Sequence, residues 1–398
     1  MAKSKIIGAI EIGASKVVVL IGDVVNGRSL SIVGMGQCSS RGVIKGDIMD
    51  FKQASDCTHA AILAAEQQAG SSIEGVYLAQ AGGHIEGFYN EAGLNVSSVE
   101  NVVSRSDIET VCQVAKAKTL PSNRTVIHHI RRPFRLDGRS VTNPEHLEGS
   151  RLEVGYWTVH GEVAKISDAI HIINGFSLHV DDLILSCLAS GVMVTTEEER
   201  RVGALVIDIG SGLTDFVLYR DGYVEMTGSF PVGGDHITND LSLGLRINHS
   251  QAEGVKMKHA RAKIEPADKN EKIWLNGDYS IGDRQIPRQA INQIASARVE
   301  EMFEVVKAKL GSSLRPESVA SGVVITGGCS RLDSICEAAT KVFGISARRG
   351  ENPQWVNEEL EGPEYSTILG LLHYGLSNQN EKANEPRKKR GLLSRLFS

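Results

Sequence analysis

The chain has 398 residues, enough for two or more domains that each bury a hydrophobic core. Its apolar fraction of 41% and charged fraction of 23% are typical of a globular protein. The formal net charge is −5 and no basic stretch carries interleaved aromatic residues, so we expect no nucleic-acid partner. The six cysteines form no CxxC pair and the N-terminus does not have the pattern of a signal peptide, so we expect a reducing cytoplasm.

The first predicted element is a hairpin over residues 6–22 (IIGAIEIGASKVVVLIG). An apolar strand ends near Glu11, a glycine turn that carries a hydroxyl follows, and a second apolar strand completes the pattern. Because a strand rather than a helix follows the turn, the motif is neither a Walker loop nor a dinucleotide fingerprint.

Residues 84–164 are predicted to form a small unit of their own. Residues 106–109 match a capping box, which predicts a helix that ends near residues 120–121. Strands are predicted at residues 126–135 and 152–159, and the polar stretch between them is predicted to be a loop.

Residues 203–220 (GALVIDIGSGLTDFVLYR) repeat the pattern of the first hairpin. Asp208 stands in the place of Glu11, and Gly210 in the place of Gly13. One such hairpin is weak evidence, since Asp–Gly turns are common in hairpins. Two copies in the same local frame indicate a pair of loops that clamp one polyphosphate between them.

The residue types in both turns suit phosphate and metal binding. Glycines let backbone N–H groups approach an anion closely, and hydroxyl groups add further donors. The carboxylates of Asp208 and Glu11 cannot contact phosphate directly and are expected to orient water around a Mg²⁺ ion. The predicted phosphate-binding residues are Gly13, Ala14, Ser15 and Lys16 in the first turn and Gly210, Ser211, Gly212, Leu213 and Thr214 in the second.

Two later segments are predicted to hold an adenosine. Residues 251–259 read as a helix with Glu253 and Lys256 on one face, where they would reach the ribose and base or form an ordinary surface pair. Residues 321–335 (SGVVITGGCSRLDSI) read as a buried strand, a glycine turn and a helix capped by Ser330. The predicted adenosine-binding residues are Glu253, Lys256, Gly327, Gly328 and Arg331.

A helix is predicted at residues 297–310, because Val299, Met302, Val306 and Leu310 recur at helical spacing. Gly311 would end it. The apolar residues 365–374 predict a further helix that packs on the body of the protein.

The C-terminal segment is predicted to be a membrane anchor. Residues 377–385 (SNQNEKANE) are polar and are predicted to be a flexible tether, although a disordered tail without a partner is the alternative. The segment that follows combines basic residues with an apolar stripe at helical spacing, as in a helix that lies in the plane of an anionic membrane. The predicted membrane-binding residues are Arg387, Lys388, Lys389, Arg390, Leu392, Leu393, Arg395, Leu396 and Phe397.

The order of these motifs resembles the superfamily of actin, DnaK-type chaperones and sugar kinases. EIGASKV, VIDIGSGLTDFVLY, PVGGDHITNDLS, ITGGCSRLDSI and PEYSTILGLLHYG, together with the tail, resemble the FtsA family of bacterial cell-division proteins. The resemblance implies an α/β, actin-like fold of two lobes and four subdomains, plus a C-terminal amphipathic helix on a flexible linker.

The resemblance also implies boundaries along the chain. The implied units are a first-lobe subdomain at residues 1–83 and 165–200, a family-specific small subdomain at 84–164, a second-lobe subdomain at 201–250 and 320–376 whose terminal helix packs on the first lobe, an upper subdomain at 251–319, a flexible linker at 377–386 and a membrane-targeting helix at 387–398.

The function implied by the resemblance is that of an adaptor. Such a protein binds ATP with Mg²⁺, forms polymers with itself on the cytoplasmic face of an anionic membrane, and tethers FtsZ there at the division septum. By resemblance, Arg298 and Met302 would contact the C-terminal peptide of FtsZ, and residues 84–164 would bind later division proteins. Arg298 on a solvated helix face is the alternative interpretation.

Two other functions stay open. A PilM-like pilus assembly protein would share the fold, and an active ATPase or kinase would share the ATP site. Superfamily ATPases place a Gln or Glu near the strand that leads into the connecting helix, and here residues 183–192 (LILSCLASGV) contain neither. We therefore predict no catalytic residue and slow or negligible hydrolysis, with ATP as a structural ligand.

Overall fold

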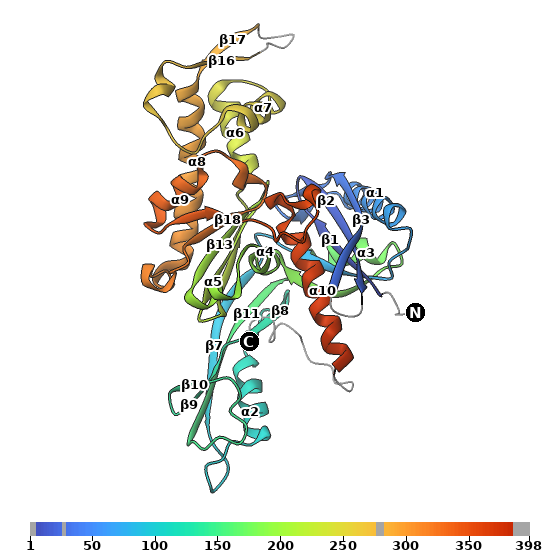
Figure 1. The fold of residues 1–398 in the computed structure, drawn as a ribbon, viewed down its shortest axis with the longest axis vertical. Helices are drawn as coiled ribbons and strands as arrows, with labels where there is room; N and C mark the ends of the chain where they lie inside the picture. Colours follow the sequence, from blue (N-terminus) through green and yellow to red (C-terminus); the bar gives the residue numbers. More distant parts are fainter. Residues whose placement is uncertain (1–4, 26–28, 276–281, 385–398) are drawn as a thin grey trace.

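This computed structural model describes residues 5–25, 29–275 and 282–384. Two lobes, each built on a five-stranded sheet, lie side by side, and a third sheet projects from one end (Figure 1). Among the described residues no helix is long and apolar enough to cross a bilayer. The predicted membrane-targeting segment, residues 387–398, lies outside the described residues.

The first lobe contains a sheet with the strand order β12-β6-β1-β2-β3. Its strands are β1 (Lys5–Ile12), β2 (Lys16–Val25), β3 (Ser29–Ser39), β6 (Gly75–Gln80) and β12 (His179–Leu185). Its helices are α1 (Phe51–Ala69) and α3 (Val163–Asn174) on one face and α4 (Ser186–Val194) and α10 (Ser366–Asn384) on the other. Side chains alternate along β2, so that Val17 packs with α1 whereas Val18 packs with α4 and α10.

The second lobe repeats this plan. Its sheet has the order β15-β14-β13-β18-β19. The elements are β13 (Ala204–Ile209), β14 (Thr214–Arg220), β15 (Tyr223–Phe230), β18 (Val323–Thr326), β19 (Ala347–Arg349), α5 (Glu197–Val202), α6 (Gly234–Leu245), α8 (Arg288–Leu310) and α9 (Ile335–Phe343). Val206 and Val217 face α4 and α10, so these two helices lie in a core shared by both sheets. The predicted hairpins are confirmed as the antiparallel pairs β1–β2 and β13–β14.

One group of elements extends beyond the second sheet. It contains α7 (His249–His259) and the hairpin of β16 (Lys272–Leu275) and β17 (Arg284–Pro287), and α6 packs against both α7 and α8 (Figure 1). Helix α8 begins at Arg288, earlier than predicted, because Ile291 and Ala295 extend the buried stripe toward its N-terminus. Gly311 ends it, as predicted.

The third sheet and α2 (Arg105–Lys116) form a separate layer at the opposite end (Figure 1). Its strands are β7 (Glu86–Asn95), β8 (Arg124–Arg131), β9 (Phe134–Leu136), β10 (Arg139–Val141) and β11 (Arg151–Glu162). This sheet contacts the second lobe through β15: Trp157 Nε1 donates to Thr227 Oγ1 at 3.0 Å, and Arg132 pairs with Glu225 at 2.7 Å. The third sheet and the second lobe are therefore joined by specific polar contacts as well as by packing.

Four local predictions are wrong. Residues 139–141 form β10 within the stretch that was predicted to be a loop. The capping box of α2 is formed by Ser104 and Asp107, and the helix ends at Lys116. Ser330 lies within a 3₁₀ turn and donates to the carbonyl of Gly327, and α9 begins after it. Helix α10 continues to Asn384, so most of the predicted flexible tether is helical, because Gln, Glu, Lys and Ala are good helix formers that extend a helix already nucleated. A short hairpin of β4 (Val43–Ile44) and β5 (Asp47–Ile48) precedes α1.

Candidate nucleotide-binding site

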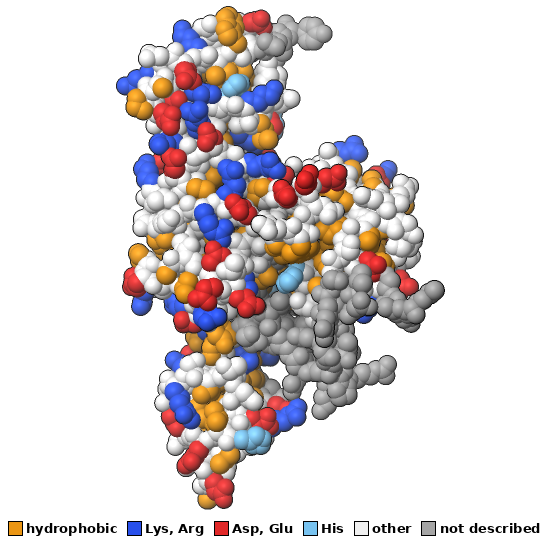
Figure 2. Space-filling model, viewed as in Figure 1, with side chains coloured by type: hydrophobic (Ala, Val, Ile, Leu, Met, Phe, Trp, Pro, Cys, Tyr) orange, Lys and Arg blue, Asp and Glu red, His pale blue; other side chains and the backbone are white. Residues whose placement is uncertain are grey.

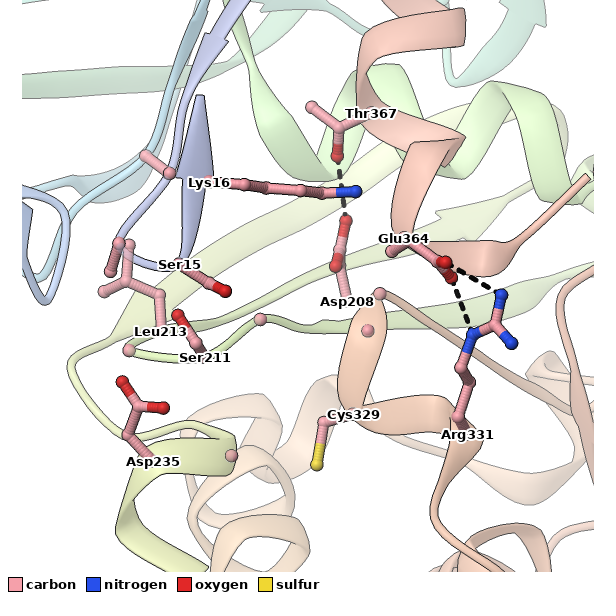
Figure 3. A pocket seen from close by; sticks show the side chains of 18 of the residues that line it. Ser15, Lys16, Asp208, Ser211, Leu213, Asp235, Cys329, Arg331, Glu364 and Thr367 are labelled. Carbon is pink, nitrogen blue, oxygen red and sulfur yellow. Dashed lines mark hydrogen bonds and ion pairs between the residues drawn. The ribbon is translucent and has the colours of Figure 1, made fainter. Parts of the chain in front are cut away.

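A cavity of about 750 Å³ lies between the two lobes and collects the predicted site residues from distant parts of the chain (Figure 3). The first turn contributes Gly13, Ala14, Ser15 and Lys16, and the second contributes Gly210, Ser211, Gly212 and Leu213. Glu253, Lys256, Gly327, Gly328 and Arg331 line the same cavity. Thr214 does not line it: this residue is fully buried and its hydroxyl donates to the carbonyl of Val232 at 2.8 Å.

The two glycine turns have the same hydrogen-bonding pattern. The N–H of Gly13 donates to the carbonyl of Lys16 at 3.0 Å, and the N–H of Gly210 donates to that of Leu213 at 2.9 Å. In Figure 3 the hydroxyl groups of Ser15 and Ser211 lie near each other, one from each lobe. The turns therefore face one another as a pair able to hold one anion.

Three carboxylates lie at the ends of the hairpin strands beside these turns. Glu11 and Asp208 were predicted; Asp215, which faces Asp208 across the hairpin, was missed. Burial, and then the charge of Asp208, raises the pKa of Glu11 to about 8. Burial raises the pKa of Asp215 to about 7 and also raises that of Asp208. A positive charge beside these three carboxylates would therefore favour their ionised form and lower their pKa values.

These side chains fit a magnesium ion held mainly through water. In the described part of the chain Glu11 Oε2 is buried without a hydrogen-bond partner, and Asp208 Oδ2 accepts from Thr367 Oγ1 at 3.0 Å. No three His, Cys, Asp or Glu side chains of the described residues converge closely enough to ligate a metal by themselves. Oxygen donors suit Mg²⁺, which keeps several of its waters in most sites.

Charged groups partly close the mouth of the cavity. Lys16 Nζ lies 3.7 Å from the ring centre of Tyr365, and burial lowers the pKa of this lysine. The guanidinium of Arg331 binds both oxygens of Glu364, at 2.7 and 2.8 Å (Figure 3). Arg331 is therefore engaged with a carboxylate in this structure, and its contact with an adenosine stays a prediction. Glu364 was missed because it lies far in sequence from the two hairpin turns and from Gly327.

The predicted helix pair lies on the wall of the cavity. Glu253 and Lys256 of α7 form an ion pair at 2.7 Å, and only 12% of the lysine side chain is exposed. Lys256 also donates to the carbonyl of Gly234, and Thr238 donates to Glu253. These contacts differ from those of an ordinary surface pair. Cys329, also missed, lies nearby on the 3₁₀ turn (Figure 3).

The segment that contains no Gln or Glu, residues 183–192, contributes one residue to the cavity. Residues 183–192 span the end of β12 and the start of α4, and Ser186 is the one that lines the cavity. Gln80, at the end of the neighbouring strand β6, and Lys165 of α3 also line it. Neither was predicted, since nothing in the local sequence around them marks a site.

The two residues predicted to contact a partner differ sharply in exposure. Met302 is 1% exposed and packs in the core of the second lobe, so its side chain cannot be reached in this conformation. Arg298 lies one turn earlier with a side chain 24% exposed, and its Nε binds Asp240 at 2.6 Å. Arg298 also pairs with Glu301. This leaves Arg298 as the candidate of the two.

Sequence comparison relates the chain to a family of division proteins. The sequence model of the Cell division protein FtsA family matches residues 205–370, and that of the SHS2 domain inserted in FTSA matches residues 82–160. The Cell division protein FtsA of Pseudomonas aeruginosa is 33% identical over 383 residues, which are 95% of this chain and 91% of that protein. The Escherichia coli K12 protein is 32% identical over 397 residues, covering 97% and 94%. The chain belongs to the FtsA family.

Solved structures share the fold at lower identity. A structure of the PilM–PilN type IV pilus biogenesis complex matches with a TM-score of 0.61 and 15% identity, covering 93% of this chain and 98% of that chain. MreB5 of Spiroplasma citri bound to ADP matches with a TM-score of 0.55 and 14% identity, covering 96% and 99%. The fold of this FtsA-family chain is therefore actin-like, as predicted.

Proposed function

We propose that this chain binds ATP with Mg²⁺, assembles with itself on the cytoplasmic face of the cell membrane, and tethers FtsZ there during division. One observation carries the proposal: two matching glycine turns, one from each lobe, line a single cavity together with α7 and the turn at Gly327. Its volume of about 750 Å³ lies within the range of small-molecule sites. Membership of the FtsA family supports the role in division.

In this proposal each lobe holds part of the nucleotide. The backbone N–H groups of the turns at Gly13 and Gly210 donate to the phosphates, and the carboxylates of Glu11, Asp208 and Asp215 orient the water around Mg²⁺. The metal supplies positive charge against the phosphates and the buried carboxylates. The adenosine lies toward α7 and Gly327.

Binding between the lobes explains how ATP would control assembly. A ligand that contacts both lobes favours the arrangement in which both sets of contacts are made. The C-terminal helix α10 and α4 pack in the core shared by both sheets, so a change between the lobes reaches the helix that leads to the tail. Assembly and membrane attachment would therefore depend on nucleotide together.

The tail at residues 387–398 would attach the assembly to anionic lipid. Each basic residue near such a surface contributes about 1 kcal/mol, and the short apolar stripe adds a few more, so one tail binds weakly and reversibly. Many tails on one polymer would bind roughly 10²–10⁴-fold more tightly through effective concentration. Later division proteins would bind the subdomain at residues 84–164.

FtsZ would be recognised on the second lobe near Arg298. This guanidinium is held by Asp240 and remains partly accessible, so a carboxylate on an incoming peptide would have to compete with an existing ion pair. Recognition would then be selective for a peptide that also supplies apolar contacts.

The test of this function is sedimentation of FtsZ with anionic vesicles. We expect FtsZ to pellet when the full chain, ATP and vesicles are present, and to stay in the supernatant with a chain that ends at Glu385. Calorimetry on the same samples measures ATP binding. Equal pelleting of FtsZ by both chains, or no ATP binding by the full chain, would contradict the proposal.

A further inference from the structure

The cavity is lined by a buried amide whose oxygen has no hydrogen-bond partner among the described residues. Gln80 is the last residue of β6, it is 5% exposed, and it lines the cavity. Its Nε2 makes one long contact of 3.5 Å to the carbonyl of Ala81, and its Oε1 is buried without a hydrogen-bond partner in the described part of the chain. Buried acceptors nearly always find a donor. The described residues supply no donor for this oxygen, and the cavity that Gln80 lines is where such a donor could bind.

The register of the sheet places this amide beside the phosphate turn. The parallel pairing of β1 with β6 runs to Ile10 opposite Leu78; two residues further on, β1 ends at Ile12, directly before Gly13, and β6 ends at Gln80. Neighbouring strands are about 4.7–4.9 Å apart. The side chain of Gln80 therefore begins one strand spacing from the chain that leads into the first phosphate turn.

The pairing of β6 with β12 places Gln80 beside residues 183–192, the stretch that contains no Gln or Glu. Leu185 at the end of β12 lies opposite Gln80, and Ser186 follows as the first residue of α4. Ser186 carries a short hydroxyl in place of a Gln or Glu. The long side chain of Gln80 rises from the adjacent strand end, so it can occupy the space beside this serine.

From this geometry we infer that Gln80 orients the water that attacks the γ-phosphorus of bound ATP, and that the chain therefore hydrolyses ATP slowly. The inference rests on the proposed ATP site. The amide oxygen accepts a hydrogen bond from the water, and this hydrogen bond directs a lone pair of the water toward phosphorus. Gln80 positions the nucleophile without taking a proton, as suits a reaction in which placement and electrostatics provide most of the rate.

The reaction balances without any further reactant. The water oxygen forms a bond to the γ-phosphorus, and the bond from that phosphorus to the β–γ bridging oxygen breaks. The electron pair of the broken bond leaves with ADP. The protons of the water pass to the phosphate product and to solvent, and Gln80 is unchanged. The amide thus contributes to the rate and not to the affinity for ATP.

The test compares Gln80→Leu, Gln80→Glu and the parent chain on anionic vesicles. Leucine has a similar size and lacks the acceptor, whereas glutamate keeps an oxygen at the same distance. We expect Gln80→Leu to lower kcat about tenfold or more and Gln80→Glu to retain most of it. The KM for ATP, and the Kd of ATP and of a non-hydrolysable analogue measured by calorimetry, are expected to stay within about twofold in both variants.

Gln53→Leu is the matched control, because Gln53 is an exposed glutamine of α1 whose amide binds Asp50 outside the cavity. We expect this variant to behave as the parent in every assay. Equal hydrolysis by Gln80→Leu and the parent would overturn the inference, as would ATP binding by the parent without any hydrolysis. Loss of ATP affinity in Gln80→Leu would assign the residue to binding instead. Failure of the parent to bind ATP would reject the site itself, a distinct outcome.

Discussion

Gly327 shows how one residue without a side chain shapes the site. Its backbone has φ 81° and ψ 168°, a region open essentially to glycine alone. A Cβ atom there would lie 2.3 Å from Asp208 Oδ1 and 2.6 Å from the carbonyl of Ile209. At the next residue, Gly328, the nearest atom to a Cβ is 3.8 Å away. A side chain at position 327 would therefore clash with its neighbours, whereas there is room for one at position 328.

We expect Gly327→Ala to lower the free energy of unfolding by about 1–3 kcal/mol, because of backbone strain. The same change should weaken Mg²⁺-dependent ATP binding, because Asp208 must move. Gly328→Ala is the matched control and should change stability by less than about 0.5 kcal/mol. Urea unfolding and calorimetry measure the two effects. Equal behaviour of the two variants would contradict the assigned role of Gly327.

His128 introduces a pH dependence at the junction of β8 with β12. The ring is buried, its Nε2 accepts from the N–H of Leu185 at 3.3 Å, and burial lowers its pKa to about 3 from an ordinary value of 6.5. The unfolded chain therefore binds a proton more readily than the folded chain between these two values. The stabilisation is complete above pH 6.5 and is lost as the pH falls toward 3.

We expect the free energy of unfolding to fall by about 1 kcal/mol from this residue between pH 6.5 and pH 5.5. Other buried histidines add to the total, so the contribution of His128 is read from a variant. In His128→Gln the free energy of unfolding should decrease by about 1 kcal/mol less between pH 6.5 and pH 5.5 than in the parent protein. Urea unfolding at both pH values gives the comparison, and identical pH profiles for the two proteins would show that folding does not lower the pKa of His128.

At the scale of the element, helix packing assigns opposite roles to two glycines. Gly370 lies where α10 crosses α4, and a Cβ there would lie 2.1 Å from the carbonyl oxygen of Ala189. Gly254 lies in α7 with nothing within 4 Å of the same position. The close approach of α10 to α4 therefore requires glycine at position 370. At position 254 glycine makes no such contact and only lowers the stability of the helix, because it is the more flexible residue.

We expect Gly370→Ala to destabilise the protein by about 1–3 kcal/mol, because α10 must move away from α4. Gly254→Ala should stabilise it by about 0.5–1 kcal/mol, because alanine is the better helix former. Thermal unfolding of the pair is the measurement. Gly370→Ala without any loss of stability would show that α10 and α4 are not packed as closely as the structure indicates.

At the scale of the whole molecule, the body is acidic and the tail is basic. The net charge is −5, although residues 387–398 carry five basic residues and no acidic one. In Figure 2, acidic and basic side chains are intermixed over the face in view, so no single basic patch on that face would dominate binding to lipid. An anionic membrane would therefore attract the tail and repel the body.

We expect the double substitution Leu393→Glu and Phe397→Glu to move the protein from anionic vesicles to the supernatant, because it removes half of the apolar stripe. Ser394→Glu with Ser398→Glu adds the same charge and keeps the stripe, so it should weaken binding less. Vesicle flotation measures both, and binding should decrease with salt, since the screening length is about 8–10 Å at moderate ionic strength. Equal loss in the two variants would mean that charge alone holds the tail.

The local features of this protein follow from its sequence. Each hairpin is encoded by a few consecutive residues: two alternating strands, a glycine turn at Gly13 or Gly210, and a carboxylate, Glu11 or Asp208. The local pattern therefore predicts both hairpins, and each hairpin supplies one half of the site. The amphipathic composition of the tail is equally local. These signals suffice because backbone conformation and side-chain periodicity depend mainly on near neighbours.

The tertiary structure decided which of these residues share one cavity. It added Gln80, Asp215 and Glu364 to the site and turned the hydroxyl of Thr214 away from it. The burial of Met302, by contrast, agrees with the apolar stripe that the sequence predicts. Burial and strand register arise when segments far apart in the chain pack together, and they set the partners and the pKa of each polar group. A glutamine therefore becomes a candidate for chemistry only when packing places it in the lining of the cavity with its amide oxygen unpaired among the described residues.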